Sequence, residues 1–523
     1  MATPSCSSAP PPPNPSPAAP LPALPAPNLM LGMTRSYLSM MKFNEQKQDY
    51  ATNVATQAEG TPERQLALDA CHKRGAERCV AVTNANRGLY VKAAQFLVAM
   101  RGGTGDRAIP QAYADALAAF TDHAPHKPAA EVADVLKGAM SLGMWPKADL
   151  DACCDLKAIE AVPVASASLA QVHRAQLRNG TWVAVKVQYP ELQTEMASDF
   201  ATFRAMGEKI REMSEGYDLM WIVEDFERSI ARELDFELEA GNAEQTAAQL
   251  AHLLPRVYVP RVFKEHSSKR VLVMEFCDNL IKVTDITALR EAGLDPQECA
   301  LLICSVFAEM IFIHGRVHAD PHSGNVYLRA VPGAAGDSSS LRPQLVLLDH
   351  GLYHDLGVGD VRLQFCRYWV ACAENDVKTV QTIGSRFAGE LSRLLPLILS
   401  PFFLPEATAS REDLVAAARG DLPSSVTMQD ITAFIAAARS GGANFIGLLH
   451  SLGYVRSLLK ALGMSEEDRV RSMLSFAVLG NTLSPSVVPP ELTSRQQAWV
   501  QSRMREIRRR LSSEKRSRAC DIL

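Results

Sequence analysis

Two short polar motifs on either side of an apolar strand constrain this 523-residue chain more than any other feature. The first is HADPHSGN at residues 318–325, in which Asp320 and Asn325 stand five positions apart. Phosphoryl transfer needs a carboxylate to orient or deprotonate the attacking oxygen, and an amide oxygen to hold a divalent metal beside the phosphates. Asp320 and Asn325 have the spacing for these two tasks, so we expect Asp320 to be catalytic and Asn325 to bind metal.

The second motif is Asp349-His350-Gly351, which directly follows the apolar run 345–348. A carboxylate at the end of a strand, followed by glycine, is how kinase-like folds present a further metal ligand. Asp349 is therefore the second expected metal ligand. Two oxygen donors completed by water suit Mg²⁺, which is a hard cation.

A lysine upstream has the setting of a phosphate-contacting residue. Residues 183–187 (VAVKV) alternate in strand fashion after the turn Asn179-Gly180, so they predict a hairpin strand that carries Lys186. Such a lysine needs a carboxylate partner to hold it in place. The segment from 221 to 254 predicts one long helix.

The acidic face of that helix supplies the partner. On a continuous helix Asp235 and Glu239 would share one face with Asn242. We expect Glu239 to be the residue that pairs with Lys186 and take it as part of the catalytic set.

The segment ASASLAQVH at residues 165–173 occupies the place of a glycine-rich phosphate loop. Backbone N–H groups can still cover phosphates there, although the Cβ atoms restrict how closely the loop approaches. We add two residues at the end of the predicted strand 270–276. The expected nucleotide-binding residues besides Lys186 are Ala165, Ser166, Ala167, Ser168, Glu275 and Cys277.

Composition narrows the remaining possibilities. The chain is 47% apolar and 21% charged, as in ordinary globular proteins. A net charge of −4 argues against a general nucleic-acid binder. Eleven cysteines without a CxxC pair favour a reducing compartment over a disulfide framework. Strands come early and helices later, which predicts a small sheet-rich lobe joined to a larger helical lobe.

The two ends of the chain give different clues to its location. The first 30 residues hold 11 of the 31 prolines, so we expect a disordered leader, compatible with a transit peptide. Residues 503–518 carry eight basic and two acidic residues before the ending CDIL, which fits prenylation of Cys520 beside a polybasic signal. No apolar run reaches the length of a membrane-spanning helix.

In this order the motifs resemble the UbiB-like, or aarF-domain-containing, atypical protein-kinase-like family. The resemblance covers roughly residues 87–356 and rests on ASASLAQVH, VAVKVQ, ELDFELEAGNAE, HADPHSGN and DHG. It implies an α+β, protein-kinase-like two-lobe fold with an N-terminal helical extension. His350 replaces the usual phenylalanine of the metal motif, as in a mitochondrial branch of the family, and Ser323 stands where proline is commoner.

The resemblance also implies residues specific to the family. Its K-x-G-Q motif, which packs over the active site, falls on Lys92 and Gln95, with Ala94 in place of glycine. Its E-x-D motif falls on Glu233 and Asp235. If these residues close the peptide-substrate side, ATP hydrolysis or a small lipid-like substrate is favoured over protein phosphorylation.

The expected organisation has five parts. They are a leader at 1–30, a helical extension at 31–157, a kinase-like N-lobe at 158–285, a helical C-lobe at 286–495 and a basic tail at 496–523. The resemblance implies an ATP- or ADP-binding, Mg²⁺-dependent ATPase or phosphotransferase. It further implies a link to isoprenoid-quinone or lipid homeostasis, at the membrane of a mitochondrion or plastid. Prenylated Cys520 would instead favour the cytosolic face of a membrane.

Three alternatives remain open. A nucleotide-gated scaffold or pseudokinase would bind nucleotide without turnover. A kinase for small molecules such as aminoglycosides or choline uses the same Asp–Asn spacing, although the alanine-rich loop argues against it. A zinc hydrolase would draw on His314, His318 and His322, but the HExxH glutamate is missing and Pro321 ends any helix.

Nucleotide should stabilise the protein only when its metal ligands are intact. At about 100 times its dissociation constant, a ligand adds about 2.7 kcal/mol of stability, a rise of a few degrees in melting temperature. We expect ADP with Mg²⁺ to produce this rise in the wild type but not in Asp349→Ala, as measured by thermal unfolding. A rise of equal size in both proteins would contradict the assignment of Asp349.

Overall fold

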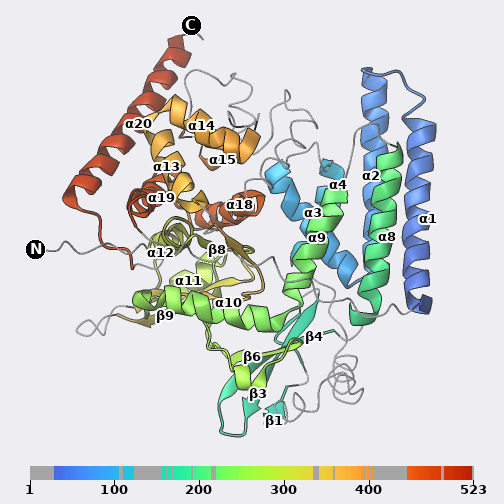
Figure 1. The fold of residues 1–523 in the computed structure, drawn as a ribbon, viewed down its shortest axis with the longest axis horizontal. Coiled ribbons are helices and arrows are strands. Elements are labelled where there is room, and N and C mark those ends of the chain that lie inside the picture. Colours follow the sequence, from blue (N-terminus) through green and yellow to red (C-terminus); the bar gives the residue numbers. More distant parts are fainter. Residues whose placement is uncertain are drawn as a thin grey trace, which may run out of the picture.

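The chain forms a two-lobe, kinase-like α+β fold with a helical extension on one side (Figure 1), as the sequence predicted. The computed structural model describes residues 29–104, 110–122, 156–160, 162–166, 169–189, 192–213, 220–333, 341–356, 360–389, 392, 395–400, 402–403, 445–483 and 488–520. The Pro-rich leader, the side chain of Cys520 and the last three residues lie outside the described part. The predictions about them therefore stay predictions.

The extension is a group of helices in which three long ones lie side by side (Figure 1). Buried Arg35 donates to both carboxylate oxygens of Asp199, at 3.0 and 2.7 Å, which ties the first helix to a helix that follows the fourth strand. The helices of this region are α1 (Leu29–Asn53), α2 (Pro62–Asn86), α3 (Leu89–Thr104), α4 (Gln111–Leu117), α5 (Ala119–Asp122), α8 (Leu192–Met213) and α9 (Met220–Glu233).

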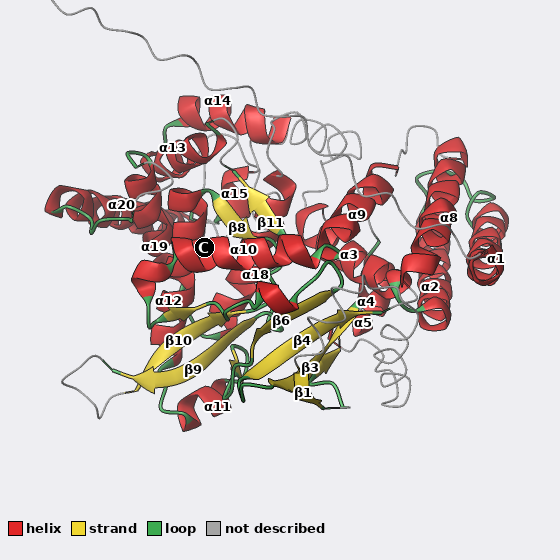
Figure 2. Cartoon of the chain, turned by 60° about the horizontal axis from the view of Figure 1, so that its bottom comes forward, coloured by secondary structure: helices red, strands yellow, loops and turns green. Residues whose placement is uncertain are grey.

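The N-lobe is a five-stranded antiparallel sheet (Figure 2). Its strands are β1 (Leu156–Ile159), β2 (Ala165–Ser166), β3 (Ala170–Leu177), β4 (Trp182–Gln188) and β6 (Val271–Glu275). The order is β1-β3-β4-β6, with β2 also paired to β3. Gly180 has φ +89° in the turn between β3 and β4, a conformation that glycine adopts without strain. Lys186 therefore sits on an interior strand.

The acidic segment after residue 220 is two helices, so the prediction of one long helix was wrong. Helix α9 ends at Glu233, and a separate helix, α10 (Phe236–Gln249), follows it. Asp235 stands just before α10, where its carboxylate accepts hydrogen bonds from the backbone N–H groups of Glu237 and Leu238. Such capping satisfies amides that have no partner within the helix. Asp235 therefore does not share a helical face with Glu239.

The C-lobe is mostly helical and holds two small sheets. Its helices are α11 (Ile286–Glu291), α12 (Pro296–Glu309), α13 (Val361–Glu374), α14 (Val377–Ala388), α15 (Leu395–Leu399), α18 (Phe445–Ala461), α19 (Glu466–Gly480) and α20 (Ser494–Cys520). Its strands are β5 (Val257–Tyr258), β7 (Ile281–Lys282), β8 (Arg316–His318), β9 (Val326–Pro332), β10 (Leu341–Leu347) and β11 (Tyr353–Asp355). The short turns are η1 (Ala251–Leu253), η2 (Lys264–His266) and a π-helical turn, η3 (Met310–His314).

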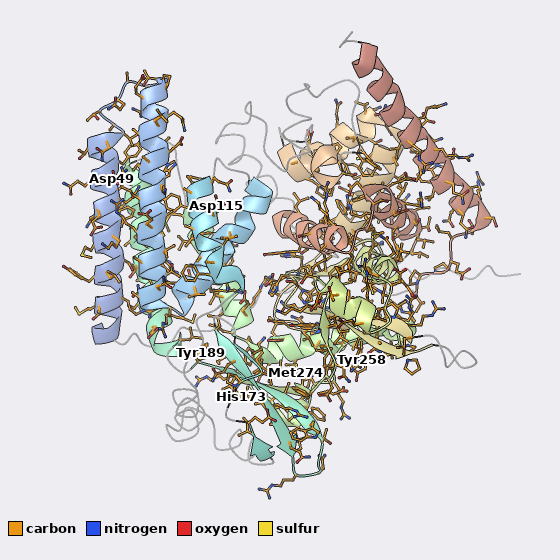
Figure 3. The ribbon with its side chains drawn as sticks, turned by 180° about the vertical axis from the view of Figure 1, so that it is seen from behind. Asp49, Asp115, His173, Tyr189, Tyr258 and Met274 are labelled. Atoms are coloured by element: carbon orange, nitrogen blue, oxygen red, sulfur yellow. The ribbon has the colours of Figure 1, made fainter. Side chains whose placement is uncertain are left out.

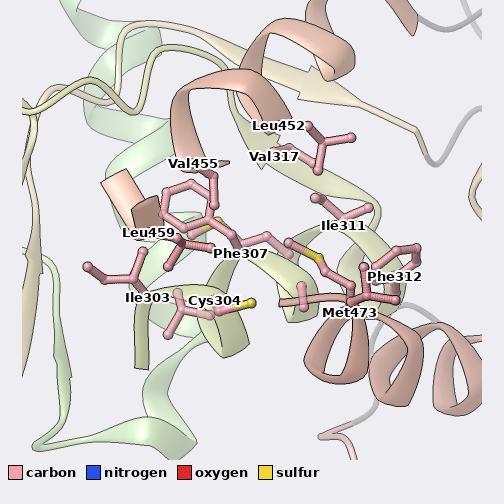
Figure 4. Packing of buried hydrophobic residues seen from close by; sticks show 14 of the residues in the cluster. Ile303, Cys304, Phe307, Ile311, Phe312, Val317, Leu452, Val455, Leu459 and Met473 are labelled. Carbon is pink, nitrogen blue, oxygen red and sulfur yellow. The ribbon is translucent and has the colours of Figure 1, made fainter. Parts of the chain in front are cut away.

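The larger of these sheets has the strand order β5-β10-β9-β7, in which β9 and β10 are antiparallel. Since HADPHSGN precedes β9 and Asp349 follows β10, this pairing brings the two polar motifs next to each other. The core beneath is formed by α12, η3, α18 and α19, with Phe307 and Phe312 fully buried (Figure 4). Basic α20 packs on this body through Val500, Met504 and Ile507.

One segment of the described chain, Pro296–His314, has the length and hydropathy of a membrane-spanning helix. It consists of α12 and η3, and 72% of its most apolar window is buried inside the C-lobe. It is therefore a core helix of this fold.

Two helical glycines, Gly480 on α19 and Gly453 on α18, give a matched test of how closely α19 packs against η3. A Cβ on Gly480 would lie 2.2 Å from the backbone oxygen of Phe312, whereas a Cβ on Gly453 would meet nothing within 4 Å. We expect Gly480→Ala to lower the free energy of unfolding by about 1–3 kcal/mol through overpacking. Gly453→Ala should raise it by up to about 1 kcal/mol through helix propensity. Urea titration of both variants measures the difference, and equal effects would contradict the close contact between α19 and η3.

Candidate active site

Lys186 is held between two carboxylates at the junction of the lobes. Its Nζ donates to both oxygens of Glu239 on α10, at 2.9 Å each, and lies 3.2 Å from Oδ1 of Asp349. Lys186 is only 9% exposed and Glu239 only 1%. A buried lysine keeps its charge only with such partners. The pairing expected from sequence is present, and the metal-motif aspartate joins it.

The three groups shift one another's proton affinity. Burial alone would lower the pKa of Lys186, but Asp349 and Glu239 raise it above its ordinary value. Burial also opposes ionisation of Asp349, yet Lys186 and Lys92 hold its pKa well below the usual range. Burial raises the pKa of Glu239 to about 7, and Lys186 offsets this only in part. At neutral pH Lys186 and Asp349 are therefore charged, and Glu239 accepts both hydrogen bonds from the ammonium group of Lys186.

The two expected metal ligands are adjacent. The backbone N–H of Leu348, next to Asp349, donates to the backbone oxygen of Asn325 at 2.9 Å. The side-chain NH₂ of Asn325 donates to the backbone oxygen of Asp320 at 3.0 Å, so its Oδ1 is left to accept a ligand. An amide oxygen beside a carboxylate fits Mg²⁺, which commonly completes its shell with water and phosphate oxygens.

Asp349 itself has an uncommon backbone conformation. Its φ is +54°, in the left-handed region that few non-glycine residues adopt. The N–H of Gly351 donates to its Oδ1 at 3.3 Å. A Cβ on Gly351 would lie 3.8 Å from Oε2 of Glu239 and 3.9 Å from the Cα of Glu233. The tightest neighbour of such a Cβ would be Oδ1 of Asp349 itself, at 3.3 Å.

Histidines brace the loop around Asp320. The N–H of Asp320 donates to Nδ1 of His318 at 3.2 Å, so Nε2 of this ring carries the proton that is donated to the oxygen of Leu348 at 3.2 Å. Burial lowers the pKa of His318. A neutral imidazole thus links the loop around Asp320 to Leu348, which lies between β10 and Asp349. Nε2 of His322 lies 3.7 Å from Oδ2 of Asp320.

His350 connects the metal motif to α10. Its backbone oxygen accepts from the side chain of Asn242 at 2.8 Å, and its ring hydrogen-bonds the hydroxyl of Tyr353 and the backbone oxygen of Leu347. Burial lowers the pKa of His350 to about 3, so the ring is neutral. A phenylalanine could not make the two ring bonds. The imidazole at this position is therefore a hydrogen-bonding strut.

Tyr353 connects His350 by further contacts to residues that the sequence analysis did not single out. Its hydroxyl is bonded to Thr246 on α10, and its ring lies 3.9 Å from the guanidinium of Arg316. Arg316 in turn donates to Thr246 and to Asn242. No motif marks Thr246, Arg316 or Tyr353. Only the pairing of β8 with β11 brings Arg316 and Tyr353 together.

The extension reaches the same site. Lys92 on α3 lies 2.7 Å from Glu233 on α9, as a salt bridge. Burial would lower the pKa of Lys92, but the carboxylates of Glu233 and Asp320 raise it above its ordinary value. Gln95, also on α3, donates to the backbone oxygen of Phe120 on α5 at 2.8 Å. Asp235 caps α10 and pairs with no extension residue in the described part of the chain.

The remaining nucleotide-binding candidates are only partly placed. Ala165 and Ser166 form the short strand β2 opposite Val172 and Gln171, while Ala167 and Ser168 lie outside the described residues. Glu275, at the end of β6, accepts a hydrogen bond from the hydroxyl of Tyr258 on β5. Figure 3 labels Tyr258 and also Met274, which precedes Glu275 on β6. Cys277 follows the strand as a free thiol, and burial raises its pKa to about 11.

The histidines do not form a metal centre. Among the described residues, no group of three or more His, Cys, Asp or Glu side chains is arranged to hold a metal ion. His314 is bonded instead to the buried carboxylate of Glu309 at 2.9 Å. The zinc-hydrolase alternative therefore finds no site in the described part of the chain.

A comparison with known families decides the relationship. A family model described as the ABC1 atypical kinase-like domain matches residues 120–384, just over half of the chain. This chain belongs to the ABC1 atypical kinase-like family. The matched range holds Lys186, Glu239, Asp320 and Asp349, and the resemblance to aarF-domain proteins is confirmed.

Relatives of this chain include kinase-named proteins of animals and amoebae. "AarF domain-containing protein kinase 1" of Xenopus tropicalis is 33% identical over 67% of this chain and 63% of that protein. "Probable serine/threonine-protein kinase abkB" of Dictyostelium discoideum is 33% identical over 64% of this chain and 47% of that protein. The match thus spans less than two thirds of either relative.

Solved structures with a similar arrangement are more distant. The Rv3197–erythromycin complex from Mycobacterium tuberculosis aligns with TM-score 0.42 and 21% identity, over 75% of this chain and 96% of that chain. The Rio2 kinase–ADP/Mg²⁺–phosphoaspartate complex from Chaetomium thermophilum aligns with TM-score 0.27 and 13% identity, over 67% of this chain and 96% of that chain.

The raised pKa of Glu239 predicts a pH-dependent difference in stability. In the folded protein the carboxyl group of Glu239 keeps its proton up to about pH 7, whereas in the unfolded chain it loses the proton near the ordinary pKa of glutamate. Glu239 therefore lowers the stability of the fold as pH rises from that ordinary pKa to about 7. Glu239→Gln lacks this contribution. Relative to wild type, its melting temperature should increase steadily between pH 5 and pH 7 and then level off. A pH-independent difference would contradict the assignment.

Proposed function

We propose that this protein is a Mg²⁺-dependent enzyme that binds ATP and transfers or hydrolyses its γ-phosphoryl group. The observation that carries the proposal is the buried contact of Lys186 with Glu239 and Asp349, beside the Asp320–Asn325 loop. A purely structural lysine would not need two carboxylates at the junction of the lobes. Family membership supports a kinase-like nucleotide-binding protein, and the catalytic activity is our proposal.

Each residue has a distinct task in this proposal. Lys186, fixed by Glu239, contacts the α- and β-phosphates, and the segment 165–168 with Glu275 and Cys277 lines the nucleotide. Asn325 and Asp349 hold Mg²⁺, which supplies charge neutralisation for the phosphates when bound. Asp320 accepts the proton of the attacking hydroxyl. The salt bridge of Lys186 with Asp349 must open or be shared for the metal to bind.

We further propose that the acceptor is water or a small lipid-like molecule. Lys92 and Glu233 form an ion pair close to the charge of Asp320, where a peptide would have to lie. Gln95 and Asp235 belong to the same family-specific set, and they act here by stabilising α3 and α10. An isoprenoid or quinone-related compound is the acceptor class that the family resemblance favours.

The location that we propose is the surface of an organelle membrane, in a mitochondrion or plastid. The Pro-rich leader without early acidic residues supports it. Attachment through Cys520 beside the basic residues of α20 would favour the cytosolic face instead. Import of a fluorescent fusion, with and without residues 1–30, separates the two.

Two substitutions test the catalytic proposal. Asp320→Asn should retain Mg·ADP binding but release ADP from Mg·ATP about 10²–10⁴-fold more slowly, because the proton acceptor is lost. Lys186→Ala should lose both binding and turnover. Lys47→Ala, an exposed position on α1, is the matched control and should change neither.

The result that would overturn the proposal is a wild-type protein that binds Mg·ADP yet releases no ADP from Mg·ATP. The nucleotide-gated scaffold would then be the better description. ADP release by a coupled assay and binding by calorimetry distinguish these cases.

A further inference from the structure

Helix α18 lies against the catalytic loop, although no sequence motif gives it a role. One side of it packs into the C-lobe core through Leu452, Val455 and Leu459 (Figure 4). A second stripe, at helical spacing, consists of Gly447, Ser451 and Tyr454. This stripe faces the residues around Asp320.

Two contacts show how directly α18 is docked. The hydroxyl of Ser451, which is 1% exposed, donates to the backbone oxygen of Ala319 at 3.2 Å, one residue before Asp320. A Cβ on Gly447 would lie 2.1 Å from Cε1 of His354 on β11. Helix α18 is therefore in direct contact with the loop around Asp320 at Ser451 and with β11 at Gly447.

Tyr454 continues this stripe toward Asp320. Its ring centroid lies 6.5 Å from that of His322, whose Nε2 lies 3.7 Å from the carboxylate of Asp320. Burial, and then the negative charge of Asp320, raise the pKa of Tyr454, so the phenol stays protonated. Within the described part of the chain no hydrogen bond of the Tyr454 hydroxyl is found, so this donor is available to a bound molecule.

We propose that Tyr454 orients the phosphoryl acceptor: its phenol donates a hydrogen bond to the acceptor oxygen while Asp320 takes the acceptor's proton. This inference rests on the proposed phosphotransferase or ATPase function. It makes the acceptor site a joint product of the catalytic loop, α18 and α3, which carries Lys92. Three converging segments suit water or a small hydroxyl compound better than an extended peptide.

The proposed step is balanced without any further reactant. The acceptor oxygen forms a bond to the γ-phosphorus, and the bond from that phosphorus to the terminal oxygen of ADP breaks. The acceptor's proton moves to Asp320, which later releases it to solvent. Tyr454 keeps its own proton throughout and contributes only orientation.

The test compares Tyr454→Phe with the wild-type chain, using Mg·ATP with water as the acceptor. Loss of one orienting hydrogen bond should lower kcat for ADP release about tenfold. The Michaelis constant for ATP and the affinity for Mg·ADP should not change. Tyr37→Phe is the matched control, because Tyr37 on α1 is 72% exposed, and its kcat should equal that of the wild type.

Several outcomes would overturn the inference. Equal kcat in Tyr454→Phe and wild type would show that the hydroxyl does nothing in turnover. A parallel loss of Mg·ADP affinity and melting temperature would show a structural role. Phosphate on Tyr454, detected by mass spectrometry, would make it the acceptor itself. A wild-type chain that binds Mg·ADP without turnover would remove this inference together with the proposed activity, whereas the first three results leave that activity intact.

Discussion

The burial of one positive charge between two negative ones organises this protein. Lys186 can lie in the interior only because Glu239 and Asp349 surround its amine. Each of the three comes from a different element: an interior strand of the N-lobe sheet, a helix that packs against it, and the end of a C-lobe strand. The ion cluster thus lies where the two lobes meet, so a change in its charge changes contacts of both lobes.

Neutral hydrogen-bonding groups hold this junction of the lobes in place around the charges. His318 ties the catalytic loop to the strand before Asp349, and His350 ties the metal motif to α10 through Asn242 and Tyr353. Burial keeps both imidazoles uncharged, so their hydrogen bonds orient the neighbouring segments without placing a further charge beside Lys186 and Asp349. The extension adds one more charged group, Lys92, whose pairing with Glu233 brings α3 to the site.

Much of this arrangement was predictable because some residue types have few other uses. A strand lysine, a carboxylate on a later helix and an Asp–Asn loop before an Asp-His-Gly turn predicted, by their order and spacing, which groups would lie close together. Three features were not predictable. The end of α9 before Asp235 depends on capping of α10, and the chain of hydrogen bonds from His350 to Arg316 depends on the β8–β11 pair. Helix α18 contacts Ala319, next to Asp320, only through packing.

The sequence by itself determined the family, the two-lobe class and the identity of the chemical groups, because local spacing and side-chain chemistry are encoded in short segments. The tertiary structure alone decided which of those groups meet. The contact of Glu239 with Lys186, which the sequence predicted, and the contact of α18 with Ala319, which it did not, join segments more than 50 and 130 residues apart, respectively. Such packing is set by the shape of buried surfaces, and no local pattern of residues records it.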